Sequence, residues 1–167
     1  MGRLRGRQPR DPREGFVTSP DAAAPKYIPD PDGLAAPFYE RLAAGILAFQ
    51  RCFDCGAFRH PPRYRCAPCG CAAYEWVASS GRGRILTWIV THRPIDPGWA
   101  AEIPYATLVV EMEEGVRVVG ALRGLAPGAL AFDLPVRVKL EPASDAFARV
   151  AFEPASDAFA RVAFEPA

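Results

Sequence analysis

Histidine is scarce in this sequence, and long hydrophobic runs are absent. Among 167 residues there are only two histidines, His60 and His92, and spacing identifies no nucleophile or acid with which either could act. No apolar run approaches membrane-spanning length, and the N-terminus lacks the apolar core of a signal peptide. We therefore expect a cytoplasmic protein that has no membrane contact and is not an enzyme by itself.

An excess of positive charge is also missing. The net charge is +1, and five of the arginines lie in the first fifteen residues, so that residues 16–167 carry 15 basic and 17 acidic side chains. Proteins that bind nucleic acid through its phosphates usually present a strongly basic surface. The alternative of a single-stranded nucleic-acid module, with Tyr74, Trp76 and Trp88 as stacking platforms, is therefore the weaker hypothesis.

Four of the five cysteines form two C-x2-C-G motifs, at Cys52 and Cys55 and at Cys66 and Cys69. Two such knuckles at this distance bring four thiolates around one tetrahedral metal ion, which we expect to be a structural Zn²⁺ with no open position for water. The same ligands could hold iron in a rubredoxin-like site. The fifth cysteine, Cys71, could replace Cys69 as a ligand or be a free thiol.

A short amphipathic helix is predicted over residues 33–46, after an irregular lead at 1–32. The apolar residues Leu34, Phe38, Leu42 and Ile46 recur every four positions, and Tyr39 widens the stripe. This stripe could pack on the same chain or dock on another subunit. The candidate docking residues are Phe38, Tyr39, Leu42 and Ile46.

The rest of the pattern predicts a mainly β protein. Residues 47–77 should form a rubredoxin-like zinc ribbon, in which nearby arginines offset the negative charge of the thiolates. Residues 78–152 should form a five-stranded OB-fold barrel, because short β-rich runs alternate with Gly and Pro turns. The expected strands are 84–92, 103–113, 116–122, 134–140 and 147–152.

The C-terminal region contains a duplication. The sequence EPASDAFARVAF occupies residues 141–152 and again residues 153–164. Either copy could supply the last strand of the barrel. We expect the first copy to do so because its connection is shorter, which leaves 153–167 as a surplus tail.

The order of helix, ribbon and barrel is specific when short motifs are taken with it. These motifs are Pro37-Phe38-Tyr39-Glu40, Gln50-Arg51-Cys52, Pro61-Pro62-Arg63, Glu75-Trp76, Ser80-Gly81-Arg82-Gly83, Ile103-Pro104-Tyr105 and residues 111–116. On these residues, the chain from about 33 to 155 resembles the zinc-ribbon OB-fold proteins that accompany thiolases, a group once catalogued as a domain of unknown function. Cys71 and Asp133 depart from the family's pattern, which usually has a small polar residue and a Gly at these places.

The resemblance implies an accessory subunit without catalytic residues. Its partner would be a thiolase-superfamily enzyme, either an acyltransferase or a lipid-transfer-type retro-aldolase, together with a hydratase-like subunit in some complexes. The helix and ribbon would dock on the enzyme, and the barrel would help to bind or channel the CoA thioester. Arg63, Arg82 and Arg84 are the candidate contacts to the phosphates of CoA.

Overall fold

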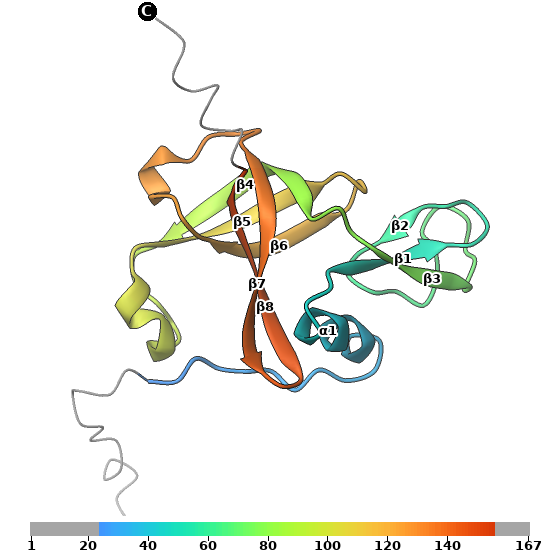
Figure 1. Ribbon diagram of the computed structural model, residues 1–167, viewed down its shortest axis with the longest axis horizontal. Helices are drawn as coiled ribbons and strands as arrows, with labels where there is room; N and C mark the ends of the chain where they lie inside the picture. Colours follow the sequence, from blue (N-terminus) through green and yellow to red (C-terminus); the bar gives the residue numbers. More distant parts are fainter. Residues whose placement is uncertain (1–23, 156–167) are drawn as a thin grey trace, which may run out of the picture.

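A computed structural model describes residues 24–155, so the predictions for residues 1–23 and 156–167 lie outside the described residues. A three-stranded ribbon lies at one end and a five-stranded barrel at the other, with one helix between them (Figure 1). This arrangement confirms the predicted mainly β fold. The elements are α1 (Ala36–Ala43), β1 (Ala48–Cys52), β2 (Phe58–Arg59), β3 (Tyr74–Ala78), β4 (Arg82–Thr91), the 3-10 helix η1 (Pro97–Glu102), β5 (Tyr105–Met112), β6 (Arg117–Leu122), the 3-10 helix η2 (Pro127–Ala129), β7 (Pro135–Ser144) and β8 (Phe147–Pro154).

The barrel closes in the order β4-β5-β6-β8-β7. Its pairs are antiparallel except for β6 and β8, which pair in parallel at only two positions, Ala121 with Ala151 and Leu122 with Phe152. Buried positions alternate with more exposed ones along β5, β6 and the first part of β4, as expected for strands with one face toward a core. The predicted strands are all present, and none of their ends is shifted by more than four residues.

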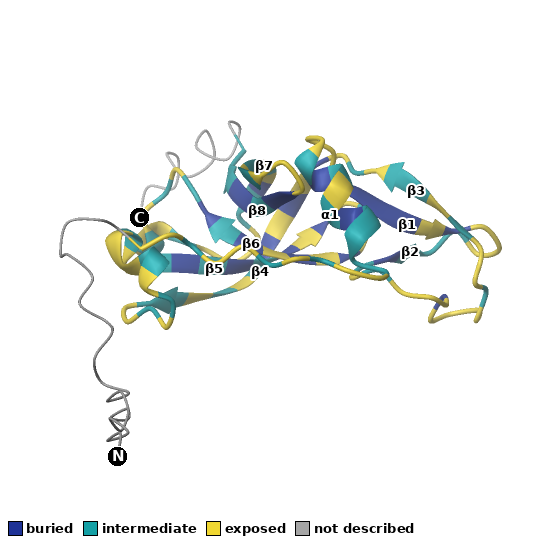
Figure 2. Cartoon of the chain, turned by 90° about the horizontal axis from the view of Figure 1, so that it is seen from below, coloured by how far each residue is buried: buried dark blue, intermediate teal, exposed yellow. Residues whose placement is uncertain are grey.

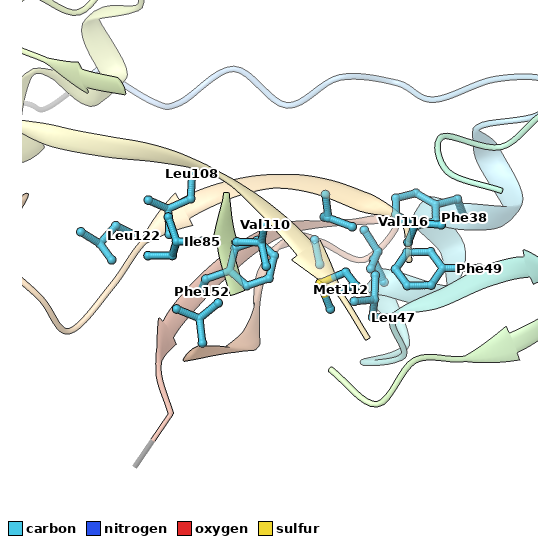
Figure 3. Close-up of a cluster of buried hydrophobic side chains, with 14 of the residues drawn as sticks. Phe38, Leu47, Phe49, Ile85, Leu108, Val110, Met112, Val116, Leu122 and Phe152 are labelled. Carbon is cyan, nitrogen blue, oxygen red and sulfur yellow. The ribbon is translucent and has the colours of Figure 1, made fainter. Parts of the chain in front are cut away.

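One hydrophobic core runs through barrel, helix and ribbon. Ile85, Val110 and Phe152 fill the barrel and are fully buried. The cluster continues past Met112 to Phe49, which comes from the first ribbon strand (Figure 3). Buried positions are accordingly found both in the barrel strands and in β1 (Figure 2). The small ribbon therefore gains apolar burial from the barrel in addition to whatever its metal site supplies.

The helix is shorter than predicted and buries most of its stripe. It ends where Gly45 adopts φ 81°, with Gly45 N–H donating to Leu42 O and Ile46 N–H to Arg41 O, the pattern of a Schellman motif. Ile46 therefore leaves the helical face and is 47% exposed. Phe38 and Leu42 are 5% and 1% exposed, because α1 packs on β8 and β1.

The expected exposed patch around Phe38, Leu42 and Ile46 is wrong for the first two residues. Of the four candidate docking residues, only Ile46 and the half-buried Tyr39 keep surface exposed to solvent. The Tyr39 ring stacks on Phe147 at a centroid distance of 4.7 Å. The stripe therefore packs on its own chain, which is one of the two alternatives that its spacing left open.

The last barrel strand comes from the first copy of the duplicated sequence. β8 begins at Phe147 and continues to Pro154, two residues into the second copy, where Glu153 pairs with Arg137 of β7. The two short 3-10 helices and the two-residue strand β2 were not predicted. In the part of the chain that the structure describes, no helix is long and apolar enough to cross a membrane.

Candidate metal centre

Four sulfur atoms converge at the tip of the ribbon. The Sγ atoms of Cys52, Cys55, Cys66 and Cys69 all lie within 4.8 Å of one another. The Cys52–Cys69 distance is 3.6 Å and the Cys55–Cys66 distance is 3.5 Å. A tetrahedron with metal–sulfur bonds of about 2.3 Å has edges of about 3.8 Å, so this spacing fits a single four-coordinate ion such as Zn²⁺. The sequence-predicted ligand set is thus brought together by the fold.

The two knuckles have the same backbone design. Cys52 O accepts from Gly56 N–H at 3.0 Å, and Cys66 O accepts from Gly70 N–H at 2.8 Å. Both glycines are left-handed, with φ of 72° and 76°. A side chain would be strained in this conformation, which explains the glycine after each second cysteine. Each knuckle is therefore a tight turn.

The sulfur atoms lie in environments that shift the pKa values of two of the thiols in opposite directions. Backbone N–H groups of Cys55 and Asp54 and the Arg59 guanidinium outweigh burial and lower the pKa of the Cys52 thiol to about 5. The N–H of Cys71 also favours a thiolate at Cys69, but lost hydration and the neighbouring thiols outweigh it and raise the pKa of Cys69 to about 12. The four sulfurs thus influence one another's ionisation, and a bound cation would favour the thiolate form of all of them.

Arg59 is the arginine that faces the thiolates. It is 4% exposed, and its guanidinium donates to Cys71 O and Ala73 O, each at 3.1 Å. Burial alone would lower the pKa of Arg59, but the Cys52 and Cys66 sulfurs outweigh burial and raise it. The sequence indicated charge compensation by several arginines without singling out Arg59. No sequence signal distinguished it, because its position depends on the pairing of β1 with the short strand β2, which was not predicted.

The other arginines of the ribbon bond to groups other than the sulfur atoms. The Arg51 guanidinium lies 3.8 Å from the Glu75 carboxylate. The exposed Arg65 guanidinium donates to Gly70 O at 3.1 Å. Arg63 is exposed, and its backbone N–H donates to the buried Gln50 Oε1 at 2.8 Å. Cys71 lies outside the four-sulfur cluster, and its Sγ lies 3.6 Å from Ala73 O.

A second feature is a groove of about 740 Å³ on the barrel. Arg82 and Arg84 line it as outward-facing residues of β4, and Arg137 of β7 joins them. Glu111 and Glu113 line the same groove, so its charge is mixed. Arg63 does not belong to it, so the three candidate CoA contacts are not brought together. Arg137 was missed, because only the pairing of β7 with β4 places it beside Arg82 and Arg84.

The glycines of the Gly81-Arg82-Gly83-Arg84 motif have a structural explanation. Gly81 has φ 72°, and a Cβ on Gly83 would lie 2.6 Å from Glu111 O. The glycines are therefore explained by the turn into β4 and by the close approach of β4 to β5, and not by a loop shaped around a phosphate. The arginines of the motif nevertheless project into the groove.

Comparison with known proteins identifies the family. The family model for the C-terminal OB-fold domain of ChsH2 matches residues 76–141. A solved structure described as "Ltp2-ChsH2(DUF35) aldolase" is 32% identical, with a TM-score of 0.70 over 76% of this chain and 98% of that chain. The chain belongs to the DUF35 family. It is thus a member of the OB-fold group that its motifs resemble.

Two further relatives extend the comparison. The 3-oxo-4,17-pregnadiene-20-carboxyl-CoA hydratase alpha subunit of Mycobacterium tuberculosis is 36% identical over 127 residues, which cover 70% of this chain and 40% of that protein. A DUF35 domain-containing scaffold protein of Methanocaldococcus jannaschii is 34% identical over 74 residues, 43% of this chain and 51% of that protein. The chain therefore spans about half or less of the length of these relatives.

Proposed function

We propose that this DUF35 chain is a non-catalytic, zinc-binding accessory subunit of a thiolase-superfamily enzyme that acts on acyl-CoA. The observation that carries the proposal is the 32% identity over 98% of the DUF35 chain in a structure described as an aldolase. Another relative is named as a subunit of a hydratase whose substrate is a CoA ester. A further relative is named as a scaffold protein, and this name implies assembly with partners. The partner reaction would be an acyl transfer or an aldolase-type cleavage.

The metal would be one structural Zn²⁺ held by the four-cysteine cluster. Four thiolates leave no site for water or substrate, so the ion would stabilise the ribbon and would not take part in the reaction. Cysteine ligands must remain reduced to bind it, which is why we propose the cytoplasm as the compartment. Arg59, beneath the knuckles, would offset the surplus negative charge of the occupied site.

The partner would contact the ribbon end of the molecule. Exposed apolar side chains there are Ile46 at 47% and Phe53 at 63%. Ile46→Asp should therefore weaken co-purification with the partner at least tenfold. Ile95→Asp is the matched control, because Ile95 is fully exposed in the loop before η1, beside the barrel. Phe38→Ala is unsuitable as a docking test, since Phe38 is buried in the core of its own chain.

The barrel groove would receive the phosphates of the CoA thioester. Arg82 and Arg84 are exposed there, whereas Arg137 is engaged by Glu153 at 2.7 Å. Arg82→Ala combined with Arg84→Ala should raise the Kd for CoA at least tenfold, and Arg63→Ala should leave it unchanged. Because phosphate contacts are charge-dependent, binding should also weaken as salt rises. Equal effects of all three substitutions would contradict this assignment of the groove.

Co-purification tests the function as a whole. The tagged chain, expressed in its native host, should recover a thiolase-like enzyme in stoichiometric amount, alone or with a hydratase-like subunit. Recovery of RNA in its place would favour the nucleic-acid alternative. The structure gives that alternative little support, because the cations of Arg41 and Arg59 already lie over the rings of Trp76 and Tyr74. Trp88 likewise packs against a neighbouring phenylalanine of the barrel, Phe132.

A further inference from the structure

A second groove, of about 600 Å³, lies on the barrel where two of its strands part. β6 and β8 pair only through Ala121 and Leu122, at the end of β6. Before these pairs, residues 118–120 of β6 and residues 147–150 of β8 both line the groove. It shares no lining residue with the groove of Arg82 and Arg84. It is therefore a separate site from the one assigned to CoA.

The walls of this second groove are mostly apolar. The rings of Trp99 and Tyr105 line it with their centroids 5.3 Å apart. The stacked rings of Tyr39 and Phe147 line it as well. Val119 contributes as an outward-facing residue of β6 and is 61% exposed, although outward positions of a sheet are usually polar. An exposed apolar hollow of this size is typical of a site that binds an apolar molecule.

The charged residues of the second groove are both positive. They are Arg117 and Arg149, and among residues 24–155 no aspartate or glutamate lines this groove. Arg117 is loosely paired, 4.0 Å from Glu111, and both side chains are more than half exposed. Glu141 lies opposite Arg149 on β7, but its carboxylate is bound by Arg123 at 2.6 Å. Arg149 is therefore the cation that is available to a ligand.

Arg149 is held beside the aromatic wall of the groove. Its Nη2 donates to Tyr27 O at 3.0 Å, and its guanidinium carbon lies 6.0 Å from the centre of the Trp99 ring. A guanidinium has five N–H donors, so several remain for a ligand. A carboxylate can accept two of them side by side, which is a strong and directional geometry for this pair.

We propose that the second groove binds an apolar monocarboxylate, with the carboxylate at Arg149 and the apolar part along the aromatic wall. A neutral apolar molecule would cover part of Arg149 without supplying a counter-charge. A molecule with several negative charges would lose their hydration in a groove that has one available cation. A single negative charge on an apolar body satisfies both conditions. The proposal goes beyond the accessory role and does not depend on CoA binding at Arg82 and Arg84.

Calorimetric titration of the full chain with decanoate, below the concentration at which it forms micelles, tests the ligand class. Decanoate should bind one to one and at least fivefold more tightly than decanol, which has the same chain without the charge. Arg149→Gln should remove this preference, and its amide can still donate to Tyr27 O. Decanoate should also bind at least tenfold more tightly than hexanoate, because each buried methylene group tightens binding about fourfold.

A matched pair of substitutions tests the place of binding. Val119 and Ile89 are outward-facing aliphatic residues of the barrel, exposed by 61% and 66%, so an aspartate at either position should leave the core intact. Only Val119 lines the second groove. Val119→Asp should raise the Kd for decanoate at least tenfold, because it puts a negative charge beside the bound chain, and Ile89→Asp should leave the Kd unchanged. Thermal unfolding checks that both variants are folded.

Three results would overturn the proposal. The first is that the natural sequence shows no saturable binding of decanoate. The second is that decanoate binds no more tightly than decanol, or that R149Q keeps the preference for decanoate. The third is that folded V119D binds decanoate as tightly as I89D does.

Discussion

The Arg84 guanidinium donates a 3.0 Å hydrogen bond to the backbone carbonyl oxygen of Asp133. Asp133 has φ 60°, the only positive φ of a non-glycine residue in residues 24–155. Its N–H donates to Ile85 O, and Ile85 N–H donates to Leu134 O. The turn before β7 is therefore fixed to β4 beside a shift in strand register, and Arg84 is held at the edge of the groove by a residue in a strained conformation.

Asp133→Gly should stabilise the protein by about 0.5–1 kcal/mol, because glycine adopts a left-handed backbone without a Cβ clash. Asp133→Ala should destabilise it by about 1 kcal/mol, since alanine has the clash and no polar side chain to relieve it. Urea unfolding monitored by circular dichroism measures both changes. A glycine variant less stable than the natural sequence would show that the carboxylate contributes more than the backbone conformation costs.

Removal of one cluster sulfur should abolish metal binding. Cys52→Ser is expected to reduce bound zinc from one ion per chain to less than a tenth, because Cys52 is the buried member of the first knuckle. Cys71→Ser should keep a full equivalent, since its sulfur lies outside the cluster. Elemental analysis of the purified proteins gives both values. Full loss of zinc in C71S would instead make Cys71 a ligand.

Arg59→Met should destabilise the zinc-bound protein by about 2–4 kcal/mol. The substitution leaves the carbonyl oxygens of Cys71 and Ala73 without their charged donor and removes the cation beside the thiolates. Arg65→Met is the control, because Arg65 makes one exposed hydrogen bond, to Gly70 O, and should cost less than 0.5 kcal/mol. Thermal unfolding at saturating zinc separates the two expectations. Equal losses would mean that the buried contacts of Arg59 contribute no more to stability than the one exposed hydrogen bond of Arg65.

Local patterns were sufficient to predict the metal cluster and the barrel. The four ligands could be assigned because C-x2-C-G is a short-range rule, and the left-handed Gly56 and Gly70 confirm the backbone that the rule requires. The barrel strands followed from alternating residues and from Gly and Pro turns. Both kinds of signal depend on residues that are close in sequence, so they can be recognised without knowledge of tertiary contacts.

The assignments that failed or stayed open depend on long-range packing. The spacing of Phe38 and Leu42 correctly indicated an apolar face, but only the fold shows that this face is covered by β8 and β1. The sequence likewise could not show that Arg82 and Arg84 share a groove with Arg137, since that requires the pairing of β4 with β7. The alternation of residues along a strand predicts which side of the sheet a side chain faces. The order of the strands determines which other residues lie beside it.

The pH dependence of stability should have a contribution from His60. This ring packs against the rings of Phe38 and Phe49, at centroid distances of 5.1 and 5.4 Å. Its Nδ1 atom is buried without a hydrogen-bond partner. Burial lowers the pKa of His60 to about 4, whereas an unfolded histidine has a pKa near 6.5. Below pH 6.5 the unfolded chain binds the proton more readily, so this contribution to stability is present at pH 7.5 and is lost progressively down to about pH 4.

His60→Leu isolates this contribution, because leucine fills the same apolar site and cannot titrate. Between pH 7.5 and pH 5 the natural sequence should lose about 1–2 kcal/mol more stability than the leucine variant. Protonation of the thiolate ligands also destabilises the ribbon in acid, but it acts on both proteins equally and cancels in the difference. Urea unfolding at the two pH values gives the comparison. Identical pH slopes for the two proteins would mean that His60 can take up a proton without leaving its place between Phe38 and Phe49.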